Sequence, residues 1–125
     1  MREIKFRAWH KDERRWINLN GFDIFFNGCI LEGMVDLIYE QGNLKPYPLK
    51  VCELVQYTGL KDQNGKEIYE GDIIKDDWRN SPRVVIFTDA CFMSDYKNGK
   101  SQEFIDFEVS EVIGNIYENP ELLES

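Results

Sequence analysis

Short runs of β-forming residues, separated by turn residues, dominate the second half of this 125-residue chain. Val, Ile, Tyr and Phe are concentrated in residues 49–57, 67–75, 83–87, 104–109 and 112–117. Several short strands joined by turns are typical of a small β-barrel or sandwich. The apolar content of 42% is enough to supply a core for such a fold. We therefore predict a mainly β protein.

The N-terminal residues also carry a two-residue period. Apolar and polar side chains alternate through residues 4–9 and again through residues 15–19, as they do in a strand with one buried face. The charged stretch 10–14 between them is expected to be a solvated loop. We predict a β-hairpin whose register puts Ile17 on the same side as Phe6.

The pattern weakens through residues 21–48, where glycines and prolines interrupt each apolar run. Pro46 and Pro48 exclude their preceding residues from the α region, which favours an extended connector. We place a domain boundary there. The N-terminal lobe, residues 1–50, is expected to be irregular apart from its hairpin, and residues 51–125 are expected to form the barrel.

Glycines mark the corners of the expected strands. Gly65, which follows Asn64, and Gly71 are predicted to take positive φ angles in tight turns, and Gly59 to form a turn at the end of a strand. Gly114 lies inside a β-type run, which indicates a bulge or a barrel corner. Residues 119–121 are Asn-Pro-Glu, an order that is typical of the start of a helix. Because few residues follow, we predict only a short C-terminal helical turn.

Cysteine usage and hydropathy indicate a reducing cytoplasm. Cys29, Cys52 and Cys91 are an odd and widely spaced set, which does not form a disulfide framework. The first residues lack the apolar run of a signal peptide, and no stretch approaches the ~20 apolar residues of a membrane helix. We expect reduced thiols, a cytoplasmic protein and no membrane partner.

The net charge is −8, and it is unevenly placed along the chain. Basic residues predominate in residues 1–16, whereas residues 101–125 hold seven acidic residues and no Lys or Arg. Because an acidic surface repels phosphate, this balance disfavours nucleic-acid binding. The opposed charges of head and tail favour self-association; the alternative is a solvated surface of mixed charge.

No residue pattern indicates catalysis. His10 is the single histidine, and in a charged loop it would be a solvated side chain rather than a catalytic base. The cysteines lack the close pairs of a zinc site. Acidic pairs, Glu70 with Asp72 and Asp76 with Asp77, arise readily in a chain with 23 Asp and Glu residues. We predict that the protein is not an enzyme and has no catalytic residue, no metal site and no cofactor.

The basic and aromatic start of the chain is the best candidate for a binding surface. Alternation puts Lys5, Arg7 and Trp9 on one face of the first strand. Arg and Trp together suit stacking on a base or docking on an acidic partner, and Trp also packs at interfaces between subunits or lobes. The residues predicted for this partner or interface surface are Arg2, Lys5, Arg7, Trp9, Trp16, Trp78 and Arg79.

Four segments together resemble the YopX family, whose members are encoded by bacteriophages and mobile elements of bacteria. They are MREIKFRAW at residues 1–9, QYTGLKD at 56–62, NGKEIYEGDII at 64–74 and EVIGNIYENPELL at 111–123. The resemblance implies an SH3-like barrel in the C-terminal half and supplies no enzymatic activity or catalytic residue. The chain departs from the family pattern at His10, where an acidic residue is expected.

Three hypotheses about function follow from these observations. The first is a non-catalytic interaction or assembly protein, expected to be a homo-oligomer, because the charges of head and tail are opposed. The second is a nucleic-acid-binding or regulatory module, which rests on the fold alone. A related variant is an acidic phage protein that binds a basic host surface, and the third hypothesis is an unrecognised enzyme.

Overall fold

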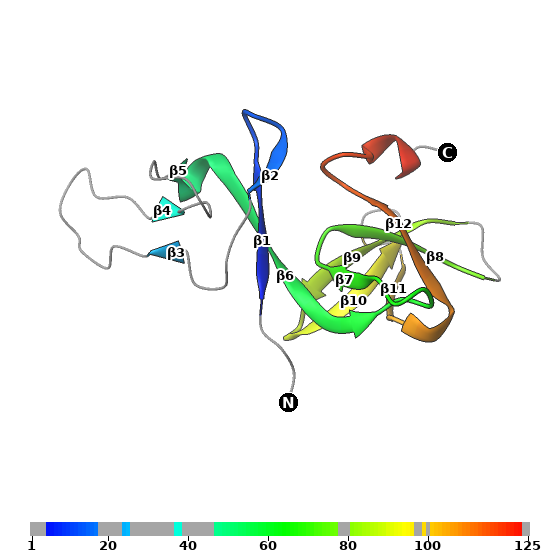
Figure 1. Cartoon of the computed structure of the whole chain (residues 1–125). Helices are drawn as coiled ribbons and strands as arrows, with labels where there is room; N and C mark the ends of the chain where they lie inside the picture. The colour runs from blue at the N-terminus through cyan, green and yellow to red at the C-terminus, as the bar shows by residue number, and fades with distance from the viewer. Residues whose placement is uncertain are drawn as a thin grey trace. The chain divides into compact units, whose positions relative to one another are not determined.

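The computed structural model describes residues 5–17, 24–25, 37–38, 47–77, 81–96, 99 and 101–123 (Figure 1). These residues form short antiparallel strands connected by turns and by brief 3₁₀ segments. The last of these segments, η3 (Pro120–Leu123), is the short C-terminal turn predicted from the Asn-Pro-Glu order. The prediction of a mainly β fold with such a turn is confirmed, and the SH3-like form of the barrel stays a prediction.

The chain forms two compact units, which divide between Val55 and Gln56. The first unit is Lys5–Val55, and the second is Gln56–Ser125 together with Met1–Ile4. The predicted division into an N-terminal lobe, residues 1–50, and a barrel, residues 51–125, stays a prediction. No helix in the described parts of the chain has the length and apolar character needed to span a membrane.

The first unit is built around an antiparallel hairpin of β1 (Phe6–His10) and β2 (Arg15–Ile17). Ala8 lies opposite Ile17, so Ile17 shares a face with Phe6 as the alternation predicted. Ala8 and Ile17 pack against Cys52 in a small buried core. The remaining elements of this unit are β3 (Ile24–Phe25), β4 (Leu37–Ile38), β5 (Tyr47–Pro48) and η1 (Leu49–Val51).

The prediction of a solvated loop from residue 10 was wrong at its first position. His10 is the last residue of β1 and is 5% exposed, and the turn is made by Lys11–Arg14. The backbone N–H of Lys11 donates to the carbonyl of Val51 at 2.9 Å, which holds the end of β1 beside η1. The charged character of residues 10–14 led us to end the predicted strand too early, because the sequence does not show this long-range contact.

The second unit contains a five-stranded antiparallel sheet in the order β11-β10-β9-β8-β12. Its strands are β8 (Asp72–Asp76), β9 (Arg83–Thr88), β10 (Cys91–Tyr96), β11 (Ser101–Phe104) and β12 (Ser110–Asn115). β6 (Cys52–Lys61) begins in the first unit and continues into the second, where it pairs with β7 (Glu67–Tyr69).

One face of the five-stranded sheet supplies the core of the second unit. Ile74 lies opposite Val112, and these two residues pack with Ile68 and Val85. All four are at least nine-tenths buried. Because side chains alternate along a strand, Ile86 and Met93, which lie opposite each other, are on the other face of the sheet.

Three glycines lie where the strands of this unit turn or change their register. Gly71 has φ +87°, as predicted, and its N–H donates to the carbonyl of Val85 at 2.8 Å. Gly114 lies at a register shift between β12 and β8, which confirms the predicted bulge. The expectation of a turn at Gly59 was wrong: with φ +88° it lies inside β6, where the pairing with β7 is irregular.

The expected strand over residues 104–109 was also wrong. β11 ends at Phe104, the last residue paired with β10, and η2 (Phe107–Val109) follows. The hydroxyl of Ser110 donates to the carbonyl of Asp106 at 2.6 Å, and the N–H of Val109 donates to the same carbonyl at 3.3 Å. These bonds close a tight turn just beyond the last residue pair of the β10–β11 ladder.

Candidate interaction surfaces

The outer face of the β1–β2 hairpin brings together part of the predicted Arg and Trp surface. Trp9 lies opposite Trp16, and their rings meet edge to face with centroids 5.1 Å apart. The guanidinium of Arg7 lies over the Trp16 ring at 4.3 Å, and that of Arg14 lies 6.0 Å from the centroid of Trp9. Strand alternation puts Lys5 on this face as well.

This surface differs from the prediction in two ways. Trp9 is only 5% exposed, so its ring is packed rather than open for stacking on a ligand. Arg14, which was not predicted, contributes an exposed cation from the turn. Arg2, Trp78 and Arg79 of the predicted surface lie outside the described residues.

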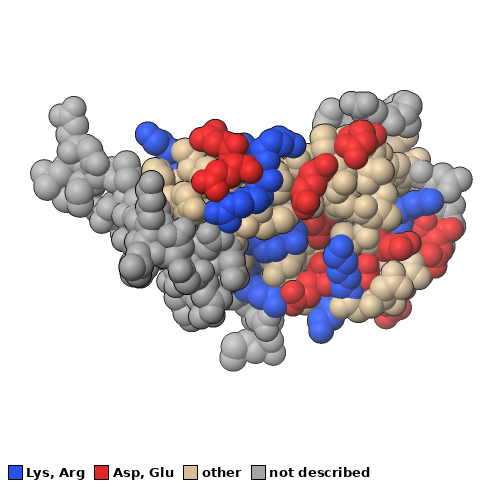
Figure 2. All heavy atoms as spheres, turned by 45° about the horizontal axis from the view of Figure 1, so that its top comes forward, with Lys and Arg blue, Asp and Glu red and all other residues tan. Residues whose placement is uncertain are grey.

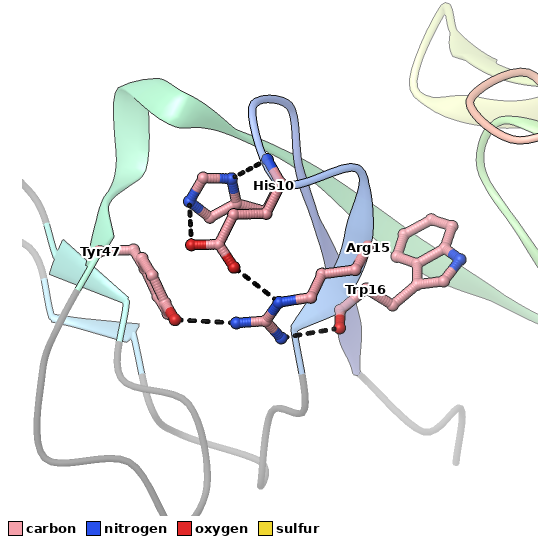
Figure 3. Close-up of polar contacts among 5 residues, drawn as sticks. His10, Arg15, Trp16 and Tyr47 are labelled. Atoms are coloured by element: carbon pink, nitrogen blue, oxygen red, sulfur yellow. Dashed lines mark hydrogen bonds and ion pairs between the residues drawn. The ribbon is translucent and has the colours of Figure 1, made fainter.

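The inner face of the same hairpin carries a polar network that sequence reasoning missed (Figure 3). The Nδ1 atom of His10 accepts a hydrogen bond from the backbone N–H of Glu13 at 3.0 Å. The proton of the neutral ring therefore lies on Nε2, which is 3.6 Å from the Glu13 carboxylate. The imidazole also meets the ring of Tyr47 edge to face, with centroids 4.9 Å apart.

Arg15 connects the His10–Glu13 pair to β5. Its Nε donates to the Glu13 carboxylate at 2.7 Å, and its Nη2 donates to the hydroxyl of Tyr47 at 2.8 Å. Because Tyr47 is 32 positions away in sequence, no local pattern could reveal the contact. The network links the hairpin to β5, and it holds His10 in a single tautomer.

The buried carboxylates of the second unit bind hydrogen-bond donors of the fold itself. Asp62 accepts the backbone N–H groups of Asn64, Lys66 and Val112, each at 2.9 Å. Burial by itself would raise the pKa of this carboxyl group. The three amides and the nearby Lys66 ammonium act in the opposite direction and outweigh burial, so the pKa of Asp62 lies below its ordinary value.

The two acidic pairs considered from sequence are separated by the fold. Asp72 accepts the N–H of Tyr69 at 2.8 Å, as a turn residue does. Asp76 is buried, and its carboxylate lies 3.0 Å from the Ser110 hydroxyl, which shares its one proton between this carboxylate and the Asp106 carbonyl. The neighbouring Asp77 is exposed and accepts the side-chain amide of Gln63 at 2.9 Å. Within the described residues, no group of three or more His, Cys, Asp or Glu side chains could hold a metal ion.

The cysteines that the structure describes are thiols in different surroundings. Cys52 is buried, and Cys91 is half-buried. Burial raises the pKa of the Cys52 thiol, and the neighbouring Lys11 opposes this only in part. A thiol with a raised pKa is a weak nucleophile, which suits a packing role. Cys29 lies outside the described residues.

A second surface, not predicted as a site, follows the end of β11. Phe104 is 79% exposed and Phe107 is 39% exposed. The intervening Asp106 and the following Glu108 are exposed carboxylates, and neither forms an ion pair within the described residues. We call residues 104–108 the acidic aromatic segment. Figure 2 shows that acidic and basic side chains are interspersed on the face in view, so charge complementarity must be local.

Two compact units made of short antiparallel strands define a mainly β protein with no long helix in its described residues. The family model described as YopX protein matches residues 5–124, and the chain belongs to this family. The family resemblance seen in the four sequence segments is thereby confirmed.

Two solved structures are similar to this chain over its whole length. Protein EF1440 from Enterococcus faecalis is 27% identical, with a TM-score of 0.62, and the match covers 99% of this chain and 100% of that chain. Protein yopX from Bacillus subtilis is 19% identical, with a TM-score of 0.62, and the match covers 100% of this chain and 98% of that chain. The second likeness concerns the fold alone. No curated protein matches the chain.

Proposed function

We propose that this protein is a non-catalytic assembly module that binds copies of itself head to tail. In this arrangement the cationic turn of the β1–β2 hairpin in one copy binds the acidic aromatic segment of the next copy. The observation that carries the proposal is Phe104, a large apolar side chain that is 79% exposed beside the carboxylates of Asp106 and Glu108. Burying such a ring in an interface contributes about 1.5–3 kcal/mol.

The hairpin turn has the complementary chemistry. Lys11 and Arg14 are exposed, and the Lys11 ammonium forms a 3.8 Å ion pair with the exposed Glu53. A cation that lies over an aromatic face gains about 0.5–2 kcal/mol, depending on how far the pair is removed from water. One turn can therefore supply both ion pairs to the carboxylates and a cation for the Phe104 ring.

The hydrogen bonds that polar side chains form within the protein support a role without catalysis. His10 is held in one tautomer by Glu13, and Asp62 and Asp72 are engaged by backbone amides. Catalytic groups are expected to direct hydrogen-bonding capacity toward a substrate. His10, Asp62 and Asp72 direct that capacity to the protein's own strands and turns.

Sedimentation velocity over a range of protein concentrations tests the proposal. We expect species larger than the monomer at low salt, and dissociation toward monomers as salt rises, because the screening length falls from about 10 Å at 0.1 M to about 3 Å at 1 M. The Phe104→Ser variant is expected to weaken assembly strongly. A wild-type protein that stays monomeric at the highest concentration and lowest salt would refute it.

The chain offers a matched control for that variant. Phe87 is also exposed, at 51%, but it lies in β9, which β10 separates from β11, and its ring contacts Phe92 with centroids 4.9 Å apart. We expect Phe87→Ser to leave the assembly unchanged. Equal loss of assembly in both variants would show that general apolar exposure, rather than the segment, drives association.

A further inference from the structure

Arg83, the first residue of β9, is a buried cation in the second unit. Its side chain is on the core face of the sheet, and the residue is only 4% exposed. Taking an arginine out of water is costly unless a counter-charge and hydrogen bonds replace its hydration. The partners of this guanidinium therefore decide whether the site is complete.

The protein engages one edge of the guanidinium. Nε donates to the hydroxyl of Ser94 at 2.9 Å, and Nη2 donates to the backbone carbonyl of Ser94 at 3.1 Å. Nη2 also donates to the carbonyl of Ser101 at 2.7 Å. The Tyr96 ring lies beside the group, with its centroid 5.7 Å from Cζ. All three acceptors are neutral, so they orient the cation without compensating its charge.

The other end of the guanidinium is unused by the described residues. Of the five N–H bonds of an arginine, three are engaged, and the two that remain are both on Nη1. No Asp or Glu of the described residues forms an ion pair with Arg83.

From this arrangement we propose that Arg83 is the receptor of a small oxyanion, which Nη1 binds with its two remaining N–H groups. The ligand chemistry is that of a carboxylate or a phosphate, whose oxygen atoms match the planar donors of a guanidinium. The bonds to Ser94 and Ser101 fix the direction of Nη1 before the ligand arrives, which lowers the entropy cost of binding. The anion supplies the counter-charge that the fold leaves out.

Side-chain ¹⁵N–¹H resonances of the full chain test this site. The wild-type protein is titrated with sodium acetate, sodium phosphate and sodium chloride at constant ionic strength, and the Nε–H signals of Arg83 and Arg15 are followed. We expect a saturable shift at Arg83 with acetate or phosphate at concentrations at least about tenfold lower than with chloride, as charge-assisted hydrogen bonds imply. The anion that saturates first identifies the carboxylate or the phosphate class.

Arg15 is the internal control, because its guanidinium is already paired with Glu13 at 2.7 Å. We expect its signal to stay unchanged through each titration. Linear, equal drift of both signals, or no shift at Arg83, would overturn the proposal and leave Arg83 as a structural link between strands.

A variant tests the orientation of the cation without removing it. Ser94→Ala deletes the hydroxyl that accepts from Nε and keeps the guanidinium and the backbone acceptors. The folded variant is expected to bind the same anion about tenfold more weakly, because the loss of one charge-assisted hydrogen bond loosens the receptor. Unchanged affinity in a folded variant would contradict the proposed orientation of Nη1.

Discussion

The carboxylate of Asp62 accepts the backbone N–H of Val112, fifty positions further along the chain, at 2.9 Å. The other carboxylate oxygen accepts the amides of Asn64 and Lys66 within its own turn. One side chain thus holds the turn that follows β6 against the edge strand β12. The contact joins two of the segments that resemble the family, residues 56–62 and 111–123.

Replacing this carboxylate by an amide is expected to destabilise the fold. Asp62→Asn puts an amide where three backbone donors converge, and leaving such a donor unsatisfied costs about 1–3 kcal/mol. The free energy of unfolding by urea measures the loss. Asp77→Asn is the control, because Asp77 is exposed and accepts only a side-chain amide, so its loss is expected to stay within about 0.5 kcal/mol. Equal losses would contradict the role of Asp62.

Acid should weaken the same contact. The pKa of Asp62 is lower in the folded state than its ordinary value of 3.8, so its contribution is complete above pH 3.8 and is lost as the pH falls through the folded-state pKa. We expect stability to decline on acidification below pH 3.8 more steeply in the wild type than in Asp62→Asn. Parallel stability curves for the two proteins would refute this.

Gly114 should not tolerate a side chain. A Cβ added there would lie 2.6 Å from Oδ1 of Asn119 and 2.9 Å from Cδ1 of Leu122. We expect Gly114→Ala to lower the unfolding free energy by about 1–3 kcal/mol, the usual cost of overpacking. In an Asn119→Ala background the same change should cost less, because the closest clash is gone. A thermal double-mutant cycle with no coupling would show that the clash is not the cause.

The turn between β9 and β10 carries backbone strain that glycine can relieve. Asp89 and Ala90 have φ angles of 50° and 63°, in the left-handed region that disfavours a Cβ. Ala90→Gly is expected to raise the unfolding free energy by about 0.5–1 kcal/mol. The reverse change, Gly65→Ala, should lower it by a similar amount, since Gly65 has φ 81° and open space around its Cα. A loss of stability in Ala90→Gly would contradict the claim that this turn carries backbone strain.

The local pattern of the sequence was sufficient where side chains alternate or a backbone position demands glycine. The hairpin register, which puts Ile17 opposite Ala8, and the bulge at Gly114 follow from such patterns. Residues 104–109 show where alternation fails. The side chains alternate there, but the pairing with β10 ends at Met93 and Phe104 although β10 itself continues to Cys91, and the chain turns into η2.

The candidate sites depended more on contacts that are distant in sequence. Strand alternation puts cations and Trp side chains on one face of the hairpin, and the guanidinium of Arg7 lies over the Trp16 ring. The burial of His10 depends on Tyr47, and the orientation of Arg83 depends on Ser101, so neither could be foreseen from neighbouring residues. The exposure of Phe104 also followed only from the early end of β11.

Mixing two charge-reversed variants tests head-to-tail assembly most directly. Lys11→Glu with Arg14→Glu reverses the hairpin turn, and Asp106→Lys with Glu108→Lys reverses the acidic aromatic segment. Sedimentation velocity is expected to show each variant alone as a monomer and the equimolar mixture as assembled, because every interface in the mixture again joins opposite charges. A mixture that sediments like the separate monomers, or single variants that assemble like the wild type, would contradict the account.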